Sequence, residues 1–155
     1  MRREGYRIAD EPAASPLSKF AVSPLWPMLG VMFGGAGLSW SWFALNSFAI
    51  GSATRKRELG LVVFGLALTS GLVLLLLSAE DRGLMSPDRF AYAVLPVIAV
   101  KLTVCYRLQL MQMRSHQLYR YFGGISRSGV VGLVLGYLLR KSLFELPLAW
   151  ALILS

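Results

Sequence analysis

The residue with the clearest potential for chemistry is a lysine inside an apolar stretch. Lys101 is the one charged residue between Arg89 and Arg107. An ionisable group at such a position in a membrane is costly, and it often marks a functional site. Two interpretations stay open: Lys101 lines a polar path, or its long side chain reaches the headgroup region near Arg107. Cys105 and Gln112 share its helical face, which indicates that this face points at protein.

A second group of charges interrupts the last apolar stretch, at Arg140, Lys141 and Glu145. Lys141 and Glu145 are four residues apart, so they can pair on one face of a helix, which lowers the free-energy cost of burying either. The group is expected either to line a polar cavity or to mark the end of a helix.

Other reactive residue types do not form a recognisable pattern. His116 is the only histidine, and no cysteine or carboxylate stands near it at metal-ligand spacing. Ser126 and Ser128 follow a glycine pair, but no Walker-type GK[ST] sequence accompanies them. We therefore expect no metal, no cofactor and no catalytic residues, and we expect that the chain is not an enzyme.

The elements that hold these residues are predicted to be membrane helices. The chain has 155 residues, 55% of them hydrophobic and 15% charged, and its apolar residues occur in long blocks. A soluble domain of this size has too little interior for so much apolar surface. The sequence thus predicts an all-α, polytopic membrane protein with about four transmembrane helices. The formal net charge of +8 then indicates topology signals and contacts with anionic lipid, not nucleic acid.

The predicted organisation is an N-terminal tail over residues 1–23 and a helical membrane domain over residues 24–155. The first three spans are expected at about residues 24–50, 59–79 and 90–110. For the last span we favour a single helix over residues 128–151. The alternative is a helix from near Leu118 to Arg140, followed by an interfacial tail.

Orientation is predicted from the arginine and lysine residues of the short loops. Residues 51–58 and 107–127 carry most of these charges, so both loops are expected to be cytoplasmic. With four spans, both termini, and Lys19 with the first of them, would then lie outside. The expected location is the cell inner (plasma) membrane.

Small residues in the first and last spans predict close helix packing. In the first span four of them recur on one helical face, followed by an asparagine that can bond across a helix interface for about 0.6–2 kcal/mol. In the last span two glycines repeat the same spacing. The predicted packing residues are Gly30, Gly34, Gly37, Ser41, Asn46, Gly132 and Gly136.

Residues 33–51 read FGGAGLSWSWFALNSFAIG. The stretch resembles the first span of a group of small bacterial four-span integral membrane proteins, which carries Gly-Gly-Pro-Leu-Ala-Gly-Gly, then asparagine, then Leu-Gly before a basic loop. The matching positions are Gly34, Gly35, Asn46 and Gly51, whereas Ala36 replaces the usual proline and Ser39 a usual glycine. The resemblance extends over most of residues 23–139; it implies four spans and gives no indication of an activity.

A second Phe-Gly-Gly element, at residues 122–124 with Ser128, also matches that group and has the same internal offset as Phe33-Gly34-Gly35 with Ser39. Such a repeat indicates two related helix pairs, a pattern found in some transporters.

Two functional hypotheses follow. The leading one is an accessory subunit, scaffold or assembly factor that acts by helix packing with other membrane chains. The alternative is a small oligomeric transporter or channel that uses Lys101 and the Arg140, Lys141 and Glu145 group. The expected partners are the lipid bilayer and other membrane protein chains.

Overall fold

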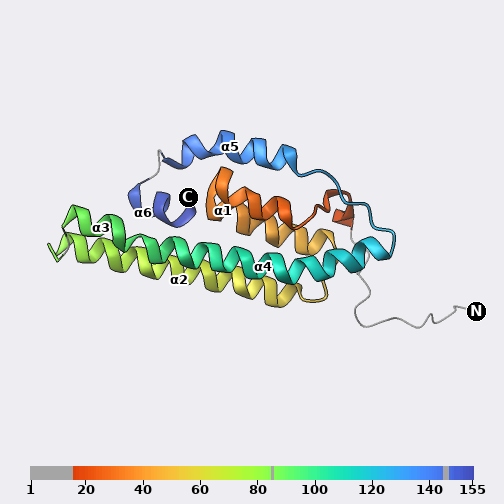
Figure 1. Ribbon diagram of the computed structural model, residues 1–155, viewed down its shortest axis with the longest axis horizontal. Helices are drawn as coiled ribbons and strands as arrows, with labels where there is room; N and C mark the ends of the chain where they lie inside the picture. The colour runs from red at the N-terminus through yellow and green to blue at the C-terminus, as the bar shows by residue number, and fades with distance from the viewer. Residues whose placement is uncertain (1–15, 85, 145–146) are drawn as a thin grey trace, which may run out of the picture.

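The computed structural model describes residues 16–84, 86–144 and 147–155, and its regular structure there is helical (Figure 1). The prediction of an all-α protein is confirmed. The elements in chain order are η1 (Pro16–Phe20), α1 (Leu25–Ala49), α2 (Arg55–Asp81), α3 (Pro87–Ala93), α4 (Leu95–Tyr121), α5 (Val130–Phe144) and α6 (Leu148–Leu154).

By length and composition alone, three stretches of the described chain could cross a membrane, although the first is broken at Gly35: Leu25–Ala49, Arg55–Asp81 and Arg89–Tyr121. These lengths support a membrane protein. The predicted total of four spans is not confirmed, because α5 and α6 are each shorter than a bilayer requires.

Helices α2 and α4 form a long antiparallel pair, and α3 extends α4 at one end (Figure 1). Gly65 of α2 lies against Val104 of α4, and Val73 shares an apolar cluster with Val97. This register places Thr69, which is halfway between Gly65 and Val73, opposite Lys101. Because Thr69 is also the midpoint of the predicted span 59–79, Lys101 lies near the middle of the apolar region.

Helix α1 is a hairpin of two half-helices. Its continuity breaks at Gly35, whose φ of 77° and ψ of 179° are not helical. Beyond the break the chain returns beside its first half, so that the Ser39 hydroxyl donates a 2.7 Å hydrogen bond to the carbonyl oxygen of Pro27, twelve residues earlier. Gly30 likewise faces the indole ring of Trp42. In Figure 1 the two halves lie side by side, and their tip lies about midway along α2 and α4.

The hairpin changes the interpretation of the first predicted span. Residues 25–34 and 36–49 make half-helices of about 15 and 21 Å, whereas the hydrocarbon core is about 30 Å thick. Residues 24–50 therefore do not form the single crossing predicted from the sequence. A composition-based prediction cannot distinguish the two arrangements, because both bury the same apolar residues.

The last apolar stretch is also broken. Instead of one helix over residues 128–151, the structure has α5 and α6. Pro147 precedes α6 with an extended ψ of 143°. Proline lacks the N–H that a continuous helix needs, and it disfavours a helical conformation in the residue before it. The single-helix prediction was wrong for this reason.

Residues 16–24, the N-terminal lead-in to α1, lie at the same end of the molecule as the loops after α1 and α4. The backbone N–H of Arg127 donates a 2.8 Å bond to the carbonyl of Ala21, and Ala21 packs against Ala49 and Ile50. Lys19 is therefore at the same end as the basic loops, not opposite them as predicted. The cause is the hairpin, which returns the chain to the end at which it entered.

The two Phe-Gly-Gly elements occupy different places. Gly35 forms the tip of the α1 hairpin, whereas Gly123 turns the chain between α4 and α5 with a φ of 84°. The predicted internal repeat of helix pairs therefore has no counterpart at these two elements.

Candidate functional site

A buried carboxylate lies where α1, α2 and α4 meet, at the end of the molecule that holds the two basic loops (the basic end). Glu58, in the first turn of α2, is 1% exposed. One of its oxygens accepts hydrogen bonds from the Ser52 hydroxyl at 2.5 Å and the Thr54 hydroxyl at 2.7 Å. The other accepts a 2.8 Å bond from the Gln112 amide. Uncharged donors thus stabilise a carboxylate that has been removed from water.

The same network connects three helices and the N-terminal lead-in. Gln112 also donates to the carbonyl oxygen of Phe43 at 2.6 Å, and its own oxygen accepts from the Asn46 amide at 3.0 Å. The Asn46 oxygen accepts the backbone N–H of Val22 at 3.0 Å. Asn46, predicted to bond across a helix interface, here joins α1 to α4. Ser115 of α4 bonds to the Ser52 hydroxyl at 3.0 Å.

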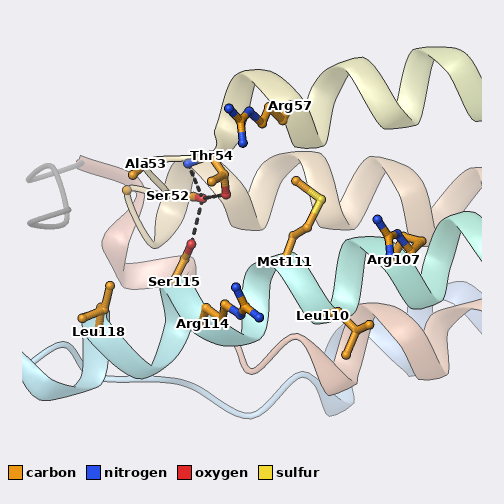
Figure 2. Close-up of a pocket in the computed structure, with 11 residues that line it drawn as sticks. Ser52, Ala53, Thr54, Arg57, Arg107, Leu110, Met111, Arg114, Ser115 and Leu118 are labelled. Atoms are coloured by element: carbon orange, nitrogen blue, oxygen red, sulfur yellow. Dashed lines mark hydrogen bonds between the residues drawn. The ribbon is translucent and has the colours of Figure 1, made fainter. Parts of the chain in front are cut away.

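A pocket of about 520 Å³ lies directly beside this network (Figure 2). One wall is a stripe of α4 with the spacing of a single helical face. The other wall is the loop after α1 together with the start of α2. The pocket is lined by Gly51, Ser52, Ala53, Thr54, Arg57, Arg107, Leu110, Met111, Arg114, Ser115 and Leu118.

Lys101 forms a second polar centre, in the second turn of α4 and opposite the middle of α2. Its side chain is 5% exposed. The ammonium donates hydrogen bonds to the backbone oxygens of Leu152 at 2.7 Å and Ser155 at 2.6 Å. One interpretation of the sequence expected the Lys101 side chain to reach the headgroup region near Arg107. It instead points to α6. It binds the carbonyls that α6 leaves unpaired at its C-terminal end.

The tip of the α1 hairpin is covered by the same end of α6. A Cβ placed on Gly35 would collide with the backbone oxygen of Leu154 and would lie 2.6 Å from the Cα of Ser155. Cys105, 1% exposed, lies one helical turn from Lys101 and accepts a 3.1 Å bond from the Trp40 indole. The predicted orientation of the Lys101, Cys105 and Gln112 face toward protein agrees with the burial of all three.

The glycines predicted to pack do so within the chain, but not as one stripe. Gly30 faces Trp42 across the hairpin, Gly37 faces Leu154, and Gly132 of α5 also faces Trp42. A Cβ on Gly34 would lie 3.0 Å from the Cα of Gly136, so α1 and α5 cross at this pair. Their common face disappears because the helix breaks at Gly35.

Ser41 lies exposed, so it takes no part in this packing. Arg140, also exposed, donates a long bond of 3.5 Å to the carbonyl oxygen of Met32, near the end of the first half-helix. The side chain of Lys141 and all of Glu145 lie outside the described residues, and so does their predicted pairing. His116 is partly buried on α4. Among the described residues no group of three or more histidine, cysteine or acidic residues could hold a metal ion.

The sequence analysis did not identify Glu58 or the pocket beside it. Glu58 follows three consecutive basic residues and lies at the end of the predicted loop over residues 51–58. The available signal was its position, as an acidic residue just before an apolar span and four residues after a threonine, where it can join the first turn of a helix.

We compared the chain with protein-family models, with curated proteins and with solved structures, and no match was found in any of the three. The resemblance to small bacterial four-span proteins thus remains a prediction from the sequence.

Proposed function

We propose that this protein acts in the membrane by binding other chains, as an accessory subunit, scaffold or assembly factor, and not by catalysis. The observation that carries the proposal is the position of α5. This helix of 15 residues is too short to cross a bilayer alone, and among the described elements it packs on α1 and α6 only. Its outer stripe of Val131, Val134 and Leu138 is between 52% and 70% exposed.

The polar interior supports the same proposal. Lys101 and Glu58, two ionisable groups buried in the helical region, both bind groups of their own chain. Such contacts hold helices in fixed positions. A partner helix packed on α5 would give it a further neighbour besides α1 and α6, since helices in lipid associate by close packing.

Photo-crosslinking in native membranes tests this proposal. A photoreactive amino acid at Leu138 should yield a discrete crosslinked product with another chain. The same group at Leu74, an exposed residue of α2 (60%), serves as the matched control and should react mainly with lipid. Failure of Leu138 to give a protein adduct above the Leu74 background would refute the proposal.

A specific observation favours transport as the second candidate. Two half-helices end near the middle of the apolar region beside Lys101, and transporters build their midplane sites from such broken helices. Purified protein in liposomes should then release entrapped chloride or phosphate faster than protein-free liposomes do. If liposomes with and without the protein release each solute at the same rate, this candidate is excluded.

A further inference from the structure

The pocket at the basic end gathers three arginines from two facing walls. Arg57 projects from α2, and Arg107 and Arg114 project from α4 two turns apart (Figure 2). Within residues 16–84, 86–144 and 147–155, no ion pair engages any of the three. All three are exposed. Their positive charges therefore remain available to a ligand.

The negative charge nearest the pocket is already engaged. Glu58 lies beneath the pocket floor, 1% exposed, and its oxygens accept hydrogen bonds from Ser52, Thr54 and Gln112. These bonds use the single hydroxyl protons of Ser52 and Thr54. The hydroxyl groups of Ser52 and Thr54 therefore have no proton left to donate to a ligand. An anion in the pocket would be bound by the arginine guanidinium groups.

The shape of the site indicates the kind of anion. Planar guanidinium groups on two walls of one pocket fit an oxyanion such as phosphate, which can accept several charged hydrogen bonds at once. The same pocket is lined by Leu110, Met111 and Leu118. It also lies at the end of α2 and α4, where an apolar span gives way to a basic loop. A free phosphate ion would gain nothing from the apolar wall, whereas the glycerol and upper acyl chain of a lipid would.

We propose that this pocket is a binding site for a phosphate group, and that the phosphate is supplied by an anionic phospholipid of the surrounding bilayer. The three arginines bind the phosphate, and the apolar side chains of α4 contact the lipid beneath it. The loop after α1 is held in place by Ser52, Glu58 and Ser115, so the site is preformed. This inference does not depend on the partner-binding function proposed above.

The test measures lipid bound to the full chain in neutral detergent by native mass spectrometry. The probes are phosphatidylglycerol, phosphatidylcholine and inorganic phosphate, each added separately, with phosphate also added as a competitor. The test variant is the pair Arg107→Gln and Arg114→Gln. The matched control is Arg82→Gln with Arg120→Gln, which removes the same charge from exposed positions that do not line the pocket.

We expect phosphatidylglycerol to be retained over phosphatidylcholine. Each arginine should contribute roughly fivefold to this binding, so the test pair should weaken it by about 25-fold. The control pair should leave it within about twofold. Binding of inorganic phosphate that is lost in the test pair, without retention of phosphatidylglycerol, would keep the phosphate site and overturn the lipid source. Equal losses in the two pairs, or no preference for the anionic lipid, would overturn the proposal.

Discussion

Replacing Lys101 by methionine is expected to loosen α6 from the interior of the protein. Methionine fills a similar volume but has no donor, so the backbone oxygens of Leu152 and Ser155 lose hydrogen bonds of 2.7 and 2.6 Å. A hydrogen bond from a charged donor contributes about 1.5–3 kcal/mol. The loss is offset because an ammonium no longer has to be buried, and interhelical bonds in membranes average only about 0.6 kcal/mol. We expect a net loss of about 2 kcal/mol.

A cysteine in place of Ile153 reports this loosening, because that side chain is 5% exposed and packs against α2 and α4. With Cys105 replaced by alanine, the new thiol is the only one in the chain. A loss of about 2 kcal/mol should accelerate its labelling by a maleimide roughly 30-fold. Lys101→Arg should stay closer to the parent rate because it retains a charged donor.

Lys56→Met serves as the control, since this lysine is exposed on α2 and the substitution is chemically the same. Its labelling rate at position 153 should equal that of the parent protein. An unchanged rate in Lys101→Met would refute the reasoning, because it would mean that the two hydrogen bonds do not hold α6 in place. An equally fast rate in Lys56→Met would show that loss of charge alone is responsible.

Two further predictions concern the hairpin. Gly35→Ala should lower the melting temperature in detergent by several degrees, because its φ of 77° costs a side chain about 1–3 kcal/mol and α6 leaves no room for a Cβ. Gly71→Ala, in open space on α2, should instead be neutral or slightly stabilising. Single cysteines replacing Lys19 and Ala53 should react with an impermeant maleimide from the same side of the membrane, and one replacing Leu84 from the other. Labelling of the first two from opposite sides would restore a single crossing by residues 24–50.

The long apolar helices could be predicted from the sequence because their signal is local. The uncharged run before Glu80 is sufficient to predict α2, and the flanking charges locate its ends. The hairpin could not be predicted in this way. A single span and two half-helices have the same length and apolar content, and they differ only in the conformation of one residue, Gly35. A glycine at position 35 is compatible with a closely packed continuous helix and also with a break in the helix, so its presence does not predict either.

The break between α5 and α6 had a usable signal. Pro147 stands inside the predicted last span, and a proline after a charged residue indicates a helix end more directly than the possible pairing of Lys141 with Glu145. The pocket arginines belong to the two basic loops, whose charges predicted topology and contact with anionic lipid but not a shared pocket. The loop with Ser52 and Arg57 lies against α4 because α2 and α4 pack as an antiparallel pair, and the sequence alone does not show that contact.

Two basic residues inside apolar stretches, Lys101 and Arg140, bind backbone oxygens near the ends of short helices. A helix that ends inside a bilayer leaves its last carbonyl oxygens without water or backbone donors, which costs several kcal/mol for each group. The C-terminal end of a helix also carries a partial negative charge. Lys101 meets the C-terminal end of α6, and Arg140 approaches Met32 near the end of the first half of α1. A cation within an apolar segment can therefore indicate a helix that ends inside the protein as well as a path for a solute.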